Sequence, residues 1–297
     1  MLLVILSSTI GYKIVSAKTK INEVDDIITY QQTKEKYLTP YNYTIDNPNT
    51  VLNPYGISPL TALIMFETPD EEEVTITVQG KDKNSTYTNT FEKTRTHYIP
   101  VLGLYPDYDN EITLKISNKV KKINIKTTAL PTNLNISKQE NNSNKLNFIS
   151  EDYLYAVDNN NDVRWYLTKN YQGQILSLKN GHIMLGGETH YNNNFSSNLL
   201  EIDLLGKVYK EYNLNNPYYN YFAETNTSLL VLSKNLLEID KQTGTLIREI
   251  ELSETFNYIN YTSNMITLEN NAKSLEINYK TEEKKYLSSS TSHSKTS

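Results

Sequence analysis

Alternating apolar and polar positions dominate the first half of the chain and predict an all-β N-terminal domain. Val74, Ile76 and Val78 alternate with threonines, which is the period of a half-buried strand. A preceding apolar run, 61–66, is expected to end at the turn signal Thr68-Pro69-Asp70. Further apolar or alternating runs lie at 87–91, 98–104, 112–116 and 123–125. About six short strands between turn signals predict a β-sandwich of the immunoglobulin or fibronectin kind.

The second half of the chain repeats a short apolar segment that ends in Asp or Asn. The repeats are residues 154–158, 199–203, 236–240 and 274–278. They recur about every 40 residues and alternate with other strand-like runs, which indicates the four-stranded blades of a β-propeller. The Asp of each repeat is expected to cap the following turn. Only about three to four blades fit, whereas a closed ring needs at least about four, so we expect a partial, unclosed propeller.

These patterns divide the chain into five parts. Residues 1–19 form a signal peptide or N-terminal anchor, 20–132 the β-sandwich domain and 133–147 a linker. Residues 148–287 form the partial propeller and 288–297 a disordered tail. Within the first domain, the polar stretch 20–40 is expected to be a short helix or a linker. An unclosed propeller further suggests either a truncated product or one part of a larger assembly.

The N-terminus predicts export. Residues 2–10 are apolar, and Val15-Ser16-Ala17 resembles a small-residue cleavage site. No Lys or Arg precedes the apolar run, and an uncleaved anchor is the alternative, although a full span needs about 20 apolar residues. The expected location is the periplasm, the extracellular space or the outer side of a membrane.

Charge and composition remove several functional classes. The net charge of -5 argues against a nucleic-acid partner, which needs a clustered basic surface. The absence of cysteine excludes disulfides and cysteine-based chemistry. Asp158, Asn160 and Asp162 alternate on a loop, as calcium ligands do, but the loop lacks the Gly and the distal Glu of an EF-hand. We therefore predict neither a metal site nor a cofactor.

Several segments together resemble the bacterial aryl-sulfate sulfotransferases. They are residues 53–64, 78–82, 96–107, 161–167 and 201–208, and the likeness extends over roughly 45–252. The resemblance implies a β-sandwich followed by a six-bladed propeller in an exported enzyme. It also implies transfer of a sulfuryl group from a phenolic sulfate ester to a phenol through a transiently sulfated histidine, without a nucleotide donor.

The chain departs from this family where the chemistry should lie. At the place of the family's His-His-Asp run stand Tyr218, Tyr219 and Asn220. A tyrosine hydroxyl can donate a hydrogen bond to sulfate but cannot replace an imidazole. These three residues are thus candidates for binding substrate or sulfate, and we predict no catalytic residue in this chain.

Two further residues are weaker candidates. Arg164 matches a motif residue of the family, although an outer-strand arginine beside Trp165 is more often a stacked surface residue. His190 lies in a polar loop that could overhang a channel, although a surface loop is the simpler reading. His97 is expected to be structural, and His182 to face solvent or pack on its hairpin turn.

Three functions remain open. The chain is a sulfotransferase relative that is inactive alone, with a second polypeptide or a second copy completing the propeller. Alternatively, it is a non-catalytic module for adhesion, dimer contacts or aryl-ligand capture. The third reading is a broken gene whose product does not accumulate.

Overall fold

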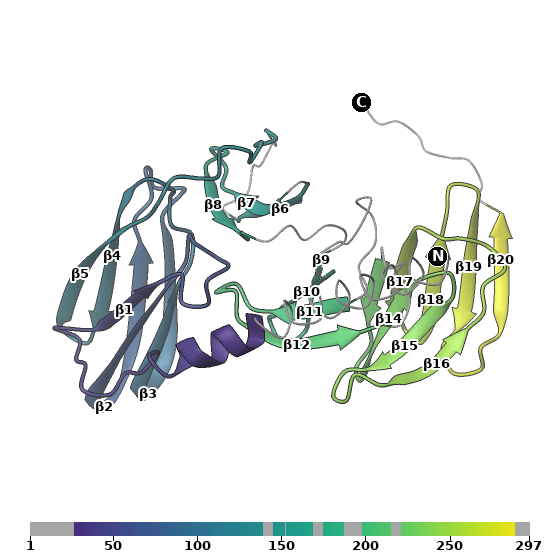
Figure 1. The fold of residues 1–297 in the computed structure, drawn as a ribbon, viewed down its shortest axis with the longest axis horizontal. Coiled ribbons are helices and arrows are strands. Elements are labelled where there is room, and N and C mark those ends of the chain that lie inside the picture. Colours follow the sequence, from purple (N-terminus) through teal and green to yellow (C-terminus); the bar gives the residue numbers. More distant parts are fainter. Residues whose placement is uncertain are drawn as a thin grey trace, which may run out of the picture.

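The computed structural model describes residues 27–138, 145–151, 153–168, 175–186, 198–214 and 221–288. Its first described segment is a helix over residues 27–35, so this part of the polar stretch is helix rather than linker. Strands dominate the rest of the described chain, as the period-2 patterns predict (Figure 1). In the described residues, no helix has both the length and the apolar character that a membrane span requires.

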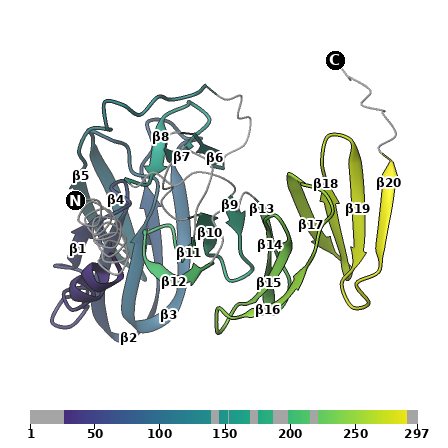
Figure 2. The same ribbon diagram turned by 45° about the vertical axis from the view of Figure 1, so that its right-hand side comes forward.

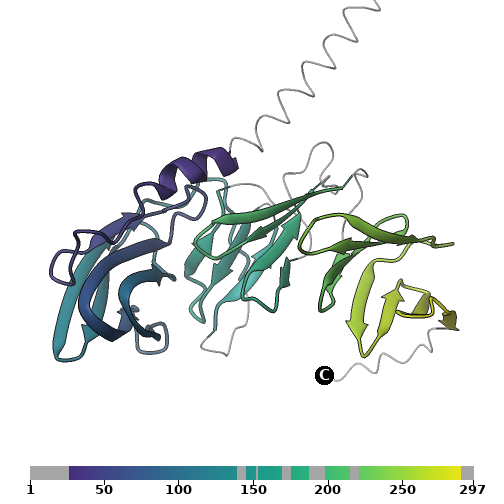
Figure 3. The same cartoon turned by 90° about the horizontal axis from the view of Figure 1, so that it is seen from below.

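The N-terminal domain is built from five antiparallel strands. They are β1 (Asn49–Leu52), β2 (Ala62–Val78), β3 (Tyr87–Val101), β4 (Asp109–Ile116) and β5 (Lys119–Lys126). The hydrogen-bonded order is β1-β2-β4-β5, with β3 paired to β2. The first half of β2 pairs with β1 and its second half with β4. Inward side chains of both halves join one apolar cluster, so the curled sheet encloses a sandwich-like core (Figure 3).

The length of β2 and β3 corrects the prediction of separate short strands. Thr68-Pro69-Asp70 does not end a strand, because β2 continues through it to Val78. Pairing between β2 and β3 shifts register between Glu67 and Val74. A bulge of this kind tolerates a proline, which cannot donate a ladder hydrogen bond. The long partner strand thus overcomes the local turn signal.

The described residues of the second half form four antiparallel sheets, named here as the first to fourth blades. The first blade comprises β6 (Asn147–Ser150), β7 (Leu154–Val157) and β8 (Val163–Tyr166). The second comprises β9 (Ile175–Ser177), β10 (Ile183–Gly186), β11 (Asn198–Ile202) and β12 (Val208–Asn213). The third comprises β13 (Tyr221–Glu224), β14 (Ser228–Leu232), β15 (Leu236–Asp240) and β16 (Leu246–Ile250). The fourth comprises β17 (Tyr258–Thr262), β18 (Met265–Glu269), β19 (Lys273–Asn278) and β20 (Lys284–Ser288). Each blade is a meander, as expected for a partial β-propeller.

The turn after each repeat is capped as predicted. In every blade a side-chain oxygen accepts backbone N–H groups from the turn that follows the repeated apolar segment. The four acceptors are Asp158, Asp203, Asp240 and Asn278. Short polar side chains of this type close such turns at little conformational cost.

An apolar cluster lies between each pair of neighbouring sheets from the sandwich to the fourth blade. Figure 2 shows the ribbon of the sandwich at one side and the third and fourth blades at the other. One side of the first blade, including Tyr155 and Val163, joins the sandwich core. Its other side, including Trp165, packs on the second blade together with Ile27 and Ile28 of the helix. The sandwich therefore covers one end of the blade stack.

Candidate functional site

The joint between the sandwich and the first blade contains a fully buried arginine, Arg164 of β8. Its Nη1 lies 2.8 Å from Asp158 Oδ2 and 2.9 Å from the Tyr105 hydroxyl. Nε donates to the Gly103 carbonyl at 2.8 Å, and Nη1 also donates to the Ser85 carbonyl at 3.0 Å. Asp158 is 1% exposed, so the charge pair is buried with its hydrogen bonds largely in place.

Two tyrosine rings enclose this guanidinium. The Cζ atom of Arg164 lies 3.8 Å from the Tyr105 ring centroid and 4.8 Å from that of Tyr87. Gly103 adopts a φ of +80°, and a Cβ there would lie 3.1 Å from the Tyr87 ring. The backbone can approach the stacked group because residue 103 has no side chain. Nη2 has no hydrogen-bond partner among the described residues.

This position corrects the reading of Arg164 as a stacked surface residue. The arginine does stack on aromatic rings, but the sandwich domain covers it completely. Its Nε and Nη1 are occupied by four protein acceptors. Arg164 therefore stabilises the contact between the sandwich and the first blade.

Oxygens of the loop with a calcium-like pattern are held by protein groups. Asp158 Oδ1 accepts from the backbone N–H groups of Asn160 and Asp162. Lys81 Nζ lies 2.9 Å from Asp162 Oδ1, and the Asn160 amide donates to Asp82 at 2.7 Å. The Asn160 hydrogen bond is the first cause of the lowered pKa of Asp82. No group of three or more metal-binding side chains occurs among the described residues.

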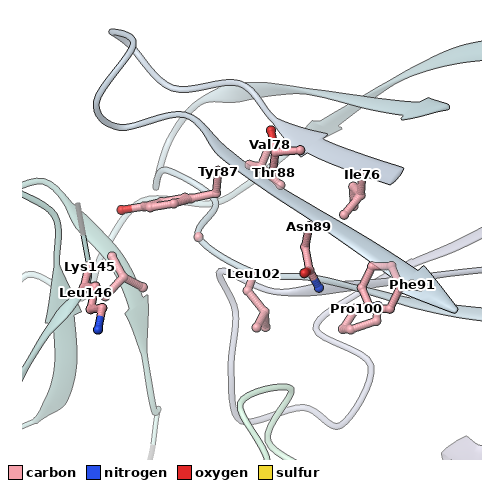
Figure 4. Close-up of a pocket in the computed structure, with 11 residues that line it drawn as sticks. Ile76, Val78, Tyr87, Thr88, Asn89, Phe91, Pro100, Leu102, Lys145 and Leu146 are labelled. Atoms are coloured by element: carbon pink, nitrogen blue, oxygen red, sulfur yellow. The ribbon is translucent and has the colours of Figure 1, made fainter. Parts of the chain in front are cut away.

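A pocket of about 420 Å³ lies beside this joint. Figure 4 shows Tyr87 pointing from β3 toward Lys145 and Leu146, with Asn89 and Phe91 farther along the same strand. Gly103, which also bonds Arg164, is part of the wall. Aromatic and apolar walls with a few polar groups are typical of small-molecule pockets.

A second polar cluster lies on the second blade and includes His182. His182 Nδ1 lies 2.6 Å from Glu201 Oε1, and its ring stacks on Tyr209 with centroids 4.1 Å apart. Asn180 also donates to Glu201, at 2.8 Å, and Tyr212 bonds its other oxygen at 3.3 Å. The sequence predicts that His182 either faces solvent or packs on its hairpin turn. It packs on the turn, and the contact is made through the buried carboxylate of Glu201.

Burial and hydrogen bonding oppose each other in this cluster. Burial acts to raise the pKa of Glu201, but hydrogen bonds from His182 and Asn180 outweigh it and leave the pKa below its ordinary value. Burial and the nearby Asp203 raise the pKa of Tyr209 to about 12. Glu201 is therefore held as a carboxylate that fixes the histidine ring.

The other candidate residues are placed as follows. His97 is 1% exposed, stacks on Phe66 and bonds Thr68 at 2.9 Å through Nε2, and burial lowers its pKa. These contacts fit the structural role expected for it. The candidates Tyr218, Tyr219, Asn220 and His190 lie outside the described residues.

Sequence reasoning missed a glutamate that repeats between blades. Glu201 and Glu238 occupy the same place in identical segments, and both are buried. Glu238 bonds Ser228 and Arg248, each at 2.6 Å, and also the hydroxyl of Tyr279. The available signal was the repeated Glu within an otherwise apolar run, since a buried carboxylate needs partners.

Comparisons with known proteins agree with this architecture. Residues 49–133 match the family model of the arylsulfotransferase Ig-like domain, and residues 119–294 match that of arylsulfotransferase (ASST). Arylsulfate sulfotransferase AssT of Escherichia coli O6:H1 (strain CFT073) is 28% identical over 145 residues, which is 42% of this chain and 24% of that protein. The match thus spans about a quarter of that relative.

The solved structures similar to this chain are distant. Apo AztD from Citrobacter koseri has a TM-score of 0.34 at 10% identity and covers 74% of this chain and 70% of its own. The Pan2 WD40 domain of Neurospora crassa has a TM-score of 0.35 at 10% identity and covers 73% and 72%. The family models, by contrast, cover both halves of the fold. The chain belongs to the arylsulfotransferase family.

Proposed function

We propose that this chain is an exported arylsulfotransferase relative that does not transfer sulfuryl groups by itself. The state of its histidines carries the proposal. A transfer through histidine needs an imidazole that attacks sulfur and later releases the group to a phenol. His97 is buried in the sandwich, and His182 is held by Glu201 and stacked on Tyr209.

The remaining sequence supports the same view. The chain has four histidines, and the other two, His190 and His293, lie in polar segments. Tyr218 and Tyr219 stand at the family's histidine pair and can bind sulfate only as hydrogen-bond donors. A further polypeptide would supply the reacting imidazole, with phenolic sulfate esters and phenols as substrates, because a second copy would carry the same four histidines.

A donor assay tests the proposal. The purified chain is incubated with 4-nitrophenyl sulfate and phenol, and released 4-nitrophenolate is measured, with the Escherichia coli relative assayed in parallel. We expect the rate of the buffer blank. Turnover that disappears when the chain is unfolded would contradict the proposed inactivity.

Export is tested separately. Cleavage after Ala17 would leave Lys18 as the N-terminus of the protein recovered outside the cytoplasm. Intact-mass measurement of fractionated cells identifies this form. An uncleaved chain in the membrane fraction would instead support an anchor, and a cytoplasmic chain of full mass would contradict export.

The pocket beside Arg164 favours a second function, capture of an aryl ligand by a non-catalytic module. Tyr87, Phe91 and Leu102 offer aromatic and apolar walls, while Asn89 offers a polar group. An aromatic ring with a hydrogen-bonding substituent suits this combination. Calorimetry with 4-nitrophenyl sulfate measures the binding.

A pair of variants localises any such binding. Leu102→Trp fills the pocket, whereas Val120→Trp adds the same ring at an exposed site 62% accessible on β5. We expect at least about a tenfold loss of affinity for the first variant alone, because the bulky side chain occupies the ligand's volume. Equal affinities in both variants would place the binding elsewhere.

A further inference from the structure

The outward side of the fourth blade differs from the corresponding side of the other blades. We call it the end face. It consists of Tyr258, Asn260, Thr262, Met265, Thr267, Glu269, Ser274, Glu276, Asn278, Lys285 and Leu287. The opposite side of the same sheet packs on the third blade through Ile259, Ile266, Leu268, Leu275 and Ile277. In Figure 2 the fourth blade lies at the far end of the stack from the sandwich.

A recurring cross-strand pair aligns the blades position by position. A glutamate on the third strand of a blade stands opposite a basic residue on the fourth strand. The pairs are Glu201 with Lys210, Glu238 with Arg248, and Glu276 with Lys285. In the second and third blades the residues immediately before and after the glutamate pack on the preceding blade. The glutamate side chain therefore lies on the opposite side of its sheet, which faces the following blade. Glu276 lies on the end face at the equivalent place.

At the positions that surround this pair, the third blade and the end face carry side chains of opposite polarity. On the third blade they are apolar and at most 7% exposed, and they pack against the fourth blade. These residues are Ala223, Leu230, Leu232 and Leu236. On the end face the same positions hold Asn260, Thr267, Glu269 and Ser274.

The second blade, like the third, is apolar at these positions. Its equivalents Leu176, Met184 and Leu199 belong to the apolar cluster shared with the third blade. Burying the end face against a further sheet would strip water from hydroxyl, amide and carboxylate groups, and each would then need a partner on that sheet, as Glu238 has in the Tyr279 hydroxyl. The apolar residues that remain, Tyr258, Met265 and Leu287, lie on the outer rows of the face, away from the Thr267–Glu276 pair.

We infer that the end face is a solvent-facing cap and that no further blade packs on it in the way the four blades pack on one another. Stacked repeats need a terminal unit with a polar outer side to stay soluble. The sandwich covers the first blade at one end of the stack, and the fourth blade presents the polar end face at the other. A second polypeptide or a second copy therefore binds at another surface or through a hydrated contact.

Thiol labelling tests the inference, because the chain contains no cysteine. Thr267→Cys places a thiol in the middle of the end face. Ser228→Cys is the protected control, since Ser228 is 0% exposed at the interface of the third and fourth blades. Thr90→Cys, on an exposed position of β3, gives the unhindered rate. The full chain is labelled with a maleimide in extracts of the producing cells and after purification.

We expect Thr267→Cys to react within about tenfold of Thr90→Cys, and Ser228→Cys at least about a hundredfold more slowly, because a buried thiol waits for local opening. Asn260→Cys provides a second probe of the same face. Protection of both end-face thiols in the extract, with rapid reaction of Thr90→Cys, would overturn the inference by revealing a partner on the face. Protection that persists after purification would overturn it in favour of a second copy.

Discussion

Arg164 Nε donates to the Gly103 carbonyl oxygen over 2.8 Å, which ties a strand of the first blade to the backbone of the sandwich. The residues are far apart in the chain, and both lie in the joint beside the pocket. Because the guanidinium also binds Asp158 and Tyr105, one side chain fixes the blade relative to the domain that covers it.

Removal of this arginine should destabilise the whole fold. Arg164→Met leaves the carboxylate of Asp158 buried without a cation, and we expect a loss of about 3–5 kcal/mol in the free energy of unfolding. Urea unfolding of the full chain measures the loss. Lys81→Met is the control, since its ion pair with Asp162 is partly exposed and should contribute about 1 kcal/mol or less. Similar losses of unfolding free energy in both variants would contradict the proposal that Arg164 stabilises the contact between the sandwich and the first blade.

Acid should weaken the contact between the third and fourth blades through Glu238. Burial acts to raise its pKa, but hydrogen bonds from Ser228, Tyr279 and Arg248 leave the pKa below its ordinary value of 4.5. The unfolded chain then binds more protons than the folded one. The stabilisation is therefore complete above the ordinary value and is lost as the pH falls through the lowered folded pKa.

Glu238→Gln should reduce stability near neutral pH and flatten its decline in acid. Unfolding free energies between about pH 7 and about pH 3 provide the measurement. Glu276→Gln changes the equivalent glutamate on the end face, where the side chain is only partly buried, and should leave the stability near neutral pH close to that of the wild type. If the unfolding free energy of Glu238→Gln declines in acid as steeply as that of the wild type, the Glu238 carboxylate is not the source of the decline.

Two glycines with positive φ should respond differently to alanine. Gly206 has a φ of +88°, and a Cβ there would lie 2.7 Å from Ile57 Cγ1. Gly181 has a φ of +85° with nothing within 4 Å of that position. Gly181→Ala should cost about 1 kcal/mol from backbone strain, whereas Gly206→Ala adds a clash of about 1–3 kcal/mol. Equal shifts in thermal unfolding would contradict the contact between the second blade and residue 57.

The helix over residues 27–35 should depend on Gln31. Its amide donates to the carbonyls of Tyr55 and Gly206, and its oxygen accepts the backbone N–H of Val208. Gln31→Ala leaves these buried groups unpaired and should cost about 2 kcal/mol. Faster tryptic cleavage at Lys34, with Gln32→Ala as the exposed neighbouring control, reports release of the helix.

The repeats show what a local pattern can decide. Apolar segments that end in Asp158, Asp203, Asp240 or Asn278 identify both the strands and the capped turns. These features arise from period-2 alternation and from hydrogen bonds that span two to four residues. Their sequence neighbourhood contains all the groups involved, so the blade could be predicted without knowledge of its surroundings.

Contacts between segments that are distant in the chain explain where the local sequence signals gave a wrong prediction. Thr68-Pro69-Asp70 reads as a turn, but β3 pairs along both halves of β2, and a bulge absorbs the proline. Arg164 reads as a surface residue beside Trp165, but the sandwich packs over it. In both cases the deciding partner comes from another strand that the residue's own neighbourhood does not contain.

The amino-acid sequence by itself determined the strand period, the capped turns and the family of this protein, because each is written in short segments. Only the tertiary structure decided the surroundings of Glu201, Glu238 and Glu276, which occupy equivalent repeats. The first two lie buried between blades with paired oxygens, and the third lies on the end face. Burial depends on which sheet packs against a strand, and that contact brings together groups that are remote along the chain.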